Sequence, residues 1–194
     1  LGVQVSLLAP QAGLPDLVFT ANAALVYERR AILSHFRHAQ RQGEEPICEQ
    51  WFADGGFTVE KLPEGGYFEG AGAALFCGDT LIAGYRIRSD VQAHQIVGQL
   101  VGSRVVPLEL IDNHYYHLDT CFCPLSHDTA LYHPAAFDDY GLRALRESVT
   151  NLIEVRAEED LPDVLRELEF DDLARVHLAA PLDPLREALR VGRR

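Results

Sequence analysis

The stretch that decides how this chain folds is YYHLDTCFCPL, residues 115–125. Every second position of its central part carries a reactive group: His117, Asp119, Cys121 and Cys123. Because side chains alternate between the two faces of a strand, this spacing predicts a strand with all four groups on one face. The face has three interpretations: a structural histidine with a carboxylate partner and core thiols, a metal site, or the lining of a binding cavity.

Composition and charge narrow the class of protein. The chain has 194 residues, 47% of them hydrophobic, which is enough for one ordinary globular core. The net charge of −12 argues against nucleic acid or an anionic membrane as partner. No segment reads as a signal peptide or a membrane span, so we expect a soluble protein. The chain starts at Leu1 and contains no methionine, so we expect that it is not a complete translated product.

The four cysteines do not form a zinc-binding or disulfide framework by their spacing. The pair Cys121 and Cys123 is C-x-C, which differs from the usual zinc pairs, and a chain of this length needs no disulfides to fold. We therefore predict free thiols, a cytoplasmic location and no metal. We also expect no cofactor.

Hydrophobic periodicity and turn residues predict a repeat of three strands and one helix. The expected strands are residues 3–10, 17–27, 29–36, 57–63, 65–78, 79–85, 104–111, 114–125 and 128–134, and the expected helices are 43–55, 90–101 and 138–148. The unit recurs three times at intervals of about 45 to 50 residues, which predicts a propeller-like or modular α/β architecture. After residue 155 the composition changes, and we expect short amphipathic helices in a second segment, residues 156–194.

A polar site occurs in each repeat, near its second strand. These sites are Asn22 in FTANA, Glu69 in FEGAG, and His117 with Asp119 in HLDT. Equivalent strands of a ring of modules meet at its centre, so these residues can converge there although they are distant in sequence. Two carboxylates, an imidazole and an amide suit a planar cation, because a guanidinium has five N–H donors that a carboxylate accepts in pairs.

The ordered motifs PDLVFTANAALV, FEGAGAALF, YRIRSD, YHLDTCFCPL and ALYHPAAF resemble the guanidino-group-modifying superfamily. That superfamily includes arginine deiminases, amidinotransferases, dimethylarginine dimethylaminohydrolases and the arginine dihydrolases of cyanobacteria, to which the resemblance is nearest. It covers about residues 3–155 and so defines a first domain, residues 1–155. It implies a pentein fold, an α/β propeller of ββαβ modules, of which this chain holds an incomplete set.

The resemblance also implies a function and residue roles. The function is a hydrolase or amidinotransferase acting on arginine or a related guanidine through a covalent cysteine adduct. In that scheme His117 is the general acid and base, Asp119 grips the guanidinium, and Glu69 is the acidic residue of the second motif. Arg88 binds the substrate carboxylate and Asn22 lines the entrance of the pocket. Cys121 and Cys123 are cavity thiols rather than nucleophiles.

Two departures from the superfamily pattern favour alternatives. The second motif ends in Ala73 where a carboxylate is expected, and no glycine-rich segment with a nucleophilic cysteine follows Asn151. Because loss of the nucleophile costs orders of magnitude in rate, a pseudoenzyme that binds arginine or a partner is the second hypothesis, and a metal-binding protein is the third. An incomplete ring exposes strand edges, so a homo-oligomer is also expected.

Overall fold

The computed structural model describes residues 5–63 and 65–155. The predicted segment 156–194 therefore lies outside the described residues. The strands are β1 (Ala24–Tyr27), β2 (Arg30–Leu33), β3 (Thr58–Glu60), β4 (Ala74–Cys77), β5 (Thr80–Tyr85), β6 (Arg104–Glu109), β7 (Phe122–Pro124), β8 (Thr129–Tyr132) and β9 (Asn151–Glu154). The α-helices are α1 (Ala39–Gln42), α2 (Glu45–Asp54), α3 (Gly70–Ala73), α4 (Val91–Val101) and α5 (Asp139–Ser148). The 3₁₀ turns are η1 (Pro15–Val18), η2 (Thr20–Asn22), η3 (Leu118–Thr120) and η4 (Pro134–Ala136).

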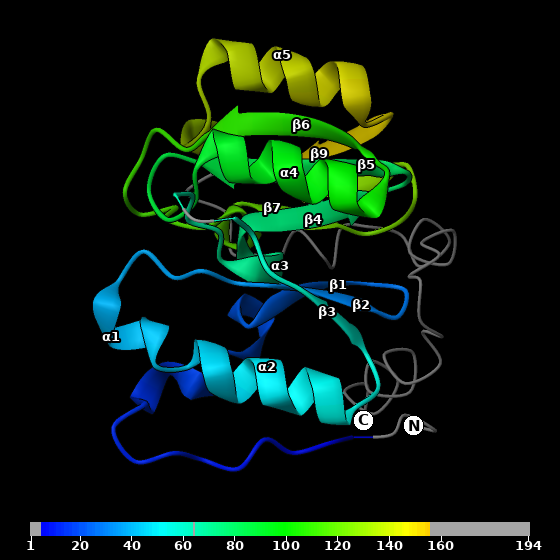
Figure 1. Cartoon of the computed structure of the whole chain (residues 1–194). Coiled ribbons are helices and arrows are strands. Elements are labelled where there is room, and N and C mark those ends of the chain that lie inside the picture. The colour runs from blue at the N-terminus through cyan, green and yellow to red at the C-terminus, as the bar shows by residue number, and fades with distance from the viewer. Residues whose placement is uncertain (1–4, 64, 156–194) are drawn as a thin grey trace, which may run out of the picture.

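The described part of the chain repeats one module three times. In each module two strands form an antiparallel hairpin, a helix follows, and a third strand returns parallel to the second: β1-β2-β3, β4-β5-β6 and β7-β8-β9. The helices α2, α4 and α5 each belong to one module, and α3 lies in the middle between β1 and β4 (Figure 1). The modular α/β fold and the ββαβ module expected from the resemblance are confirmed, whereas the order of three strands and a helix is wrong.

The error in the order has a simple cause. When three strands and one helix repeat along a chain, the same order of elements fits modules that begin at different strands. Only the pairing of the strands shows where a module begins. The sequence pattern places residues 58–60 and 104–109 at the start of the next repeat, but these residues pair in parallel with β2 and β5 and end the preceding module. The strand expected at residues 3–10 is also wrong for its described part, because residues 5–10 have no regular structure.

The hydrophobic core follows the modules. One cluster fills the space between the second and third modules and includes Ile82, Leu108, Leu118 and Phe122. A second lies between α4, its sheet and the first module, with Leu25, Phe68, Leu81 and Val97. A third packs α2 against β1 and β2. Burial of these side chains at about 25 cal/mol per Å² of apolar surface is the main force that holds the modules together. No helix in the described part is long and apolar enough to cross a membrane.

Candidate active site

The site lies where the three modules begin. A single helical turn leads into the first strand of every module: η2 before β1, α3 before β4, and η3 before β7. The residues that cap these turns at their N-termini are Phe19, Glu69 and His117. Helix α3 contacts both η2 and η3, so the three turns meet at the centre of the structure. The fold therefore brings residues 47 to 95 positions apart into contact.

Glycines allow this close approach. Gly70 has φ +60°, and a Cβ there would lie 2.9 Å from the backbone oxygen of Ala21. A Cβ on Gly72 would lie 2.1 Å from Nδ2 of Asn22 and 3.4 Å from Nδ1 of His117. The glycine-rich motif thus leaves room for the amide and the imidazole, as expected where one backbone must approach another group closely.

Glu69 is the most enclosed charged group of the site. Its exposure is 0%, and its two carboxylate oxygens accept hydrogen bonds from different segments. Oε2 accepts from Nη1 of Arg88 at 3.2 Å and lies 2.8 Å from Nε2 of His117, while Oε1 accepts from the backbone N–H of Arg37 at 3.3 Å. Burial by itself raises the pKa of Glu69, but the hydrogen bond from His117, the positive charge that His117 carries when protonated, and the charge of Arg88 outweigh burial and hold that pKa below its ordinary value.

The ionised Glu69 fixes the proton on His117. A carboxylate is an acceptor only, so Nε2 of His117 must donate and carry the ring proton. The other ring nitrogen, Nδ1, lies 3.5 Å from Nδ2 of Asn22. The ring is 5% exposed, and the backbone oxygen of His117 accepts a hydrogen bond from Oγ1 of Thr120 at 2.6 Å. The imidazole is therefore held on both sides, with Nε2 toward Glu69 and Nδ1 toward the amide of Asn22.

Two arginines approach Glu69 from outside the turns. Arg88, from the segment between β5 and α4, has a side chain 22% exposed, and its guanidinium lies 5.0 Å from the ring centre of Tyr116. Arg37 contributes its backbone N–H to Glu69, while its guanidinium pairs with Asp90 and lies 4.5 Å from the ring centre of Tyr67. The sequence reasoning missed Arg37, because no spacing marks an arginine in a loop between a strand and a helix.

The strand predicted over residues 114–125 is confirmed only at residues 122–124, and Asp119 and the two cysteines do not share one face with His117. Residues 118–120 form η3, and only residues 122–124 form β7, so the alternation of a strand does not hold across the motif. Asp119 is exposed; neighbouring protein atoms raise its pKa, and the nearby His117 opposes that rise. Cys121 is buried with its Sγ 3.4 Å from the backbone oxygen of Leu118, whereas Cys123 is exposed. The helical turn explains the difference, because consecutive side chains point around it rather than to two sides.

Ala73, the departure noted in the sequence, is 1% exposed and belongs to the hydrophobic cluster that includes Leu25 and Phe68. It ends α3, directly before β4. In the described part of the chain, no three His, Cys, Asp or Glu side chains are grouped so that they could hold a metal ion. His117 faces Glu69 and Asn22 rather than the cysteines.

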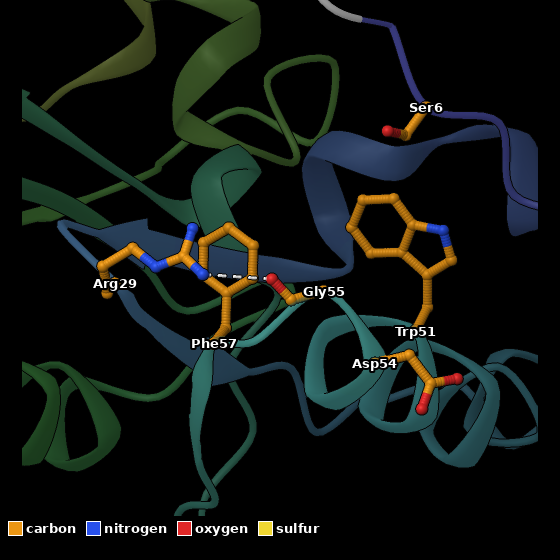
Figure 2. A pocket seen from close by; sticks show the side chains of 6 residues that line it. All are labelled: Ser6, Arg29, Trp51, Asp54, Gly55 and Phe57. Atoms are coloured by element: carbon orange, nitrogen blue, oxygen red, sulfur yellow. Dashed lines mark hydrogen bonds between the residues drawn. The ribbon is translucent and has the colours of Figure 1, made fainter.

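A hollow of about 500 Å³ lies away from these residues, at the C-terminal end of α2. Figure 2 shows the guanidinium of Arg29 in front of the ring of Phe57 and joined to the oxygen of Gly55. Arg29 also donates to the oxygen of Gly56 at 2.9 Å. It therefore binds the two carbonyls that directly follow the end of the helix, a structural role.

Comparison with known proteins places this geometry in a family. The structure matches the solved N-terminal domain of ArgZ bound to product, an arginine dihydrolase from cyanobacteria, with a TM-score of 0.76 and 40% identity over 94% of this chain and 74% of that one. The chain belongs to the guanidino-group-modifying, or pentein, superfamily. No protein-family model matches it.

Curated relatives in the superfamily agree. The bifunctional arginine dihydrolase/ornithine cyclodeaminase ArgZ of Synechocystis is 51% identical over 143 residues, which are 73% of this chain and 20% of ArgZ. The dimethylarginine dimethylaminohydrolase of Mycobacterium tuberculosis is 37% identical over 137 residues, 71% of this chain and 45% of that enzyme. The chain thus spans between a fifth and about half of the length of these relatives.

Proposed function

We propose that this chain carries the part of a guanidine hydrolase site that binds the guanidinium and transfers protons, with arginine or a related guanidine as substrate. The buried contact of 2.8 Å between Glu69 and His117, at the meeting point of the three modules, is the observation that carries the proposal. The names of the relatives, an arginine dihydrolase and a dimethylarginine dimethylaminohydrolase, support this substrate class.

The charges of the site suit a cationic, planar group. Glu69 supplies a fully buried negative charge, and Asp119 supplies a second carboxylate next to His117. In the proposed role Asp119 grips the guanidinium, whose planar N–H groups match a carboxylate. Arg88, partly exposed beside Glu69 and Tyr116, is in position to receive the carboxylate of an amino-acid substrate. Asn22 closes the site from the first module.

His117 has the hydrogen bonds of a general acid and base. In the proposed reaction a thiol gives its proton to His117 and adds as the thiolate to the guanidinium carbon, and His117 passes that proton to the nitrogen that leaves as ammonia. The neutral His117 then takes a proton from water, whose oxygen adds to the carbon, and returns it to the sulfur as the carbon–sulfur bond breaks; citrulline forms and the remaining proton goes to the ammonia. With methylated arginine the leaving group is the methylated amine instead.

The nucleophilic thiol is not among the four cysteines of this chain in our proposal. Burial raises the pKa of Cys48 to about 11 and that of Cys121 to about 12, and it also raises the pKa of Cys77. Cys123 is exposed, but the protein atoms around its thiol raise its pKa as well. A thiol with a raised pKa is a poor nucleophile at neutral pH. Covalent turnover therefore requires a thiolate from outside these four residues. The free thiols accord with a reducing cytoplasm, where we propose that the protein acts.

A second candidate is a protein that binds arginine without turnover. Two observations favour it: Ala73 takes the place of a carboxylate in a buried position, and no cysteine of the chain has a lowered pKa. Incubation of the purified 194-residue chain with L-arginine and an excess of a small-molecule thiol, which supplies the nucleophile, assayed for citrulline, ornithine and ammonia, separates the two. Product that disappears in His117→Ala supports the hydrolase. Binding by calorimetry without product supports the binder. If the chain shows no binding and forms no product, the proposed ligand class is contradicted.

A further inference from the structure

We propose that Arg41, paired with Glu44, is a positioning residue: it fixes the side-chain amide of Asn22 and thereby keeps Nδ1 of His117 unprotonated between catalytic steps. This inference deepens the proposed function and rests on it only for the use of that nitrogen in catalysis. It assigns a purpose to a buried ion pair whose further hydrogen bonds go to Asn22 and Asp16 rather than to Glu69 or His117.

The ion pair is built as a rigid unit. The side chains of Arg41 and Glu44 are 7% and 3% exposed. Nε and Nη2 of Arg41 donate to the two carboxylate oxygens at 3.0 and 2.8 Å, the bidentate geometry that gives such pairs their directionality. The guanidinium also lies 4.2 Å from the ring centre of Phe36 and donates to the backbone oxygen of Asp16 at 3.3 Å.

One donor of this rigid unit remains for the amide. Nη1 of Arg41 lies 3.4 Å from Oδ1 of Asn22, and Nδ2 of Asn22 lies 3.5 Å from the backbone oxygen of Glu69. A guanidinium only donates and a carbonyl only accepts, so both neighbours require the same orientation of the amide. If the amide turned over, its N–H₂ would face the donors of Arg41 and its oxygen would face the carbonyl of Glu69.

The orientation of the amide determines which group of Asn22 faces Nδ1 of His117. With Oδ1 toward Arg41, the N–H₂ of Asn22 faces Nδ1 of His117 at 3.5 Å. Nδ1 must then be an acceptor, which agrees with the donation of Nε2 to Glu69 from the other side of the ring. A proton that arrives at Nδ1 makes it a donor and opposes the N–H₂. Only rotation of the amide relieves this conflict, and Arg41 resists that rotation.

The side-chain amide of Asn22 can be observed directly, because the sequence contains only three asparagines. Selective ¹⁵N-asparagine labelling of the full chain gives side-chain signals for Asn22, Asn113 and Asn151 only, and Asn22→Ser assigns the first. Asn113 and Asn151 are exposed and serve as internal references. In the unaltered protein we expect the side-chain N–H₂ of Asn22 to exchange with water at least about tenfold more slowly than the references, since exchange requires a local opening. Equal exchange rates overturn the proposal without any variant.

Two variants separate positioning from stability. Arg41→Lys keeps the positive charge beside Glu44, but an ammonium lacks the planar guanidinium that donates to the carboxylate of Glu44 and to the amide of Asn22 together. We therefore expect the slow exchange of the Asn22 side-chain N–H₂ to be lost while the fold remains. R41M with E44Q removes both charges together and is the second test if Arg41→Lys does not fold. The matched control is R30M with E60Q, which removes an ion pair of 2.9 Å between β2 and β3 in the same module.

The outcomes decide the inference separately from the proposed function. Faster exchange of Asn22 in the Arg41 variants, with no change in the R30M/E60Q control, supports positioning by Arg41. Unchanged exchange in folded Arg41 variants contradicts it, and so does an equal change in the control. The measurement uses no arginine, so failure of the protein to bind arginine refutes the proposed function and leaves this result standing.

Discussion

Replacement of Glu69 by glutamine is expected to destabilise the fold by an amount that the contacts of this residue predict. Glu69→Gln keeps the size of the side chain but removes the negative charge at an exposure of 0%. Two charge-assisted contacts weaken, those with His117 at 2.8 Å and Arg88 at 3.2 Å. Hydrogen bonds to charged groups contribute about 1.5–3 kcal/mol each, and the partial exposure of Arg88 reduces its share. We expect a loss of about 3 kcal/mol, or about 6–12 °C in Tm for a chain of this size.

The loss should depend on pH in a defined direction. Because the pKa of Glu69 is lower in the folded state than in the unfolded chain, its contribution is complete above the unfolded value of about 4.3 and disappears as the pH falls through the folded value. The stability difference between the unaltered protein and Glu69→Gln should therefore be constant near neutral pH and shrink in acid.

Urea unfolding followed by circular dichroism at several pH values measures both effects. The matched control is Glu49→Gln, since Glu49 forms an exposed ion pair with Lys61 that should contribute within about 1 kcal/mol. A loss below about 1 kcal/mol for Glu69→Gln at neutral pH is incompatible with the calculated strength of its buried contacts. A difference that grows in acid would refute the direction of its pKa shift.

Three further predictions test the surroundings of the site. Gly72→Ala places a Cβ 2.1 Å from Nδ2 of Asn22, so a loss of about 1–3 kcal/mol from this overpacking is expected in thermal unfolding; an unchanged Tm would show that the amide moves aside at little cost. His94 is 0% exposed with neither ring nitrogen hydrogen-bonded, and burial lowers its pKa to about 4. Between about pH 6.5 and 4 the unfolded chain therefore binds a proton that the folded chain does not, so the free energy of unfolding should fall by about 3 kcal/mol over that interval. This pH dependence should disappear in His94→Leu. If it persists in that variant, His94 is not its cause. In native protein a thiol reagent should react fastest with the exposed Cys123, and modification of a buried cysteine first, located by mass spectrometry, would be inconsistent with the structure.

The modular architecture was predictable because it depends on local signals. Turn residues and apolar runs marked most strands, and the helix predicted at residues 43–55 corresponds to α2 at Glu45–Asp54. The phase of the repeat was not predictable, since it depends on parallel pairing such as that of Ile82 with Val106, a contact between residues on opposite sides of a helix. Local patterns carry no information on which neighbour a strand joins.

The site was predictable in part for a related reason. Glu69 and His117 stood out because an acid between glycines and a histidine in a recurring position have little structural justification, and the structure brings them together. The alternating spacing around His117 suggested a strand, but the chain needs a helical turn to enter β7 from the centre. The Arg41–Glu44 pair gave no signal, because an arginine three residues before a glutamate is common on exposed helices.

Calorimetric titration of the purified chain with L-arginine and with citrulline tests the central claim most directly, since citrulline has the same shape but an uncharged ureido group in place of the guanidinium. The account predicts that arginine binds, that citrulline binds at least about tenfold more weakly, and that Glu69→Gln abolishes this preference. Equal affinity for both ligands, or a preference for arginine that survives Glu69→Gln, would contradict a guanidinium site at the meeting point of the three modules.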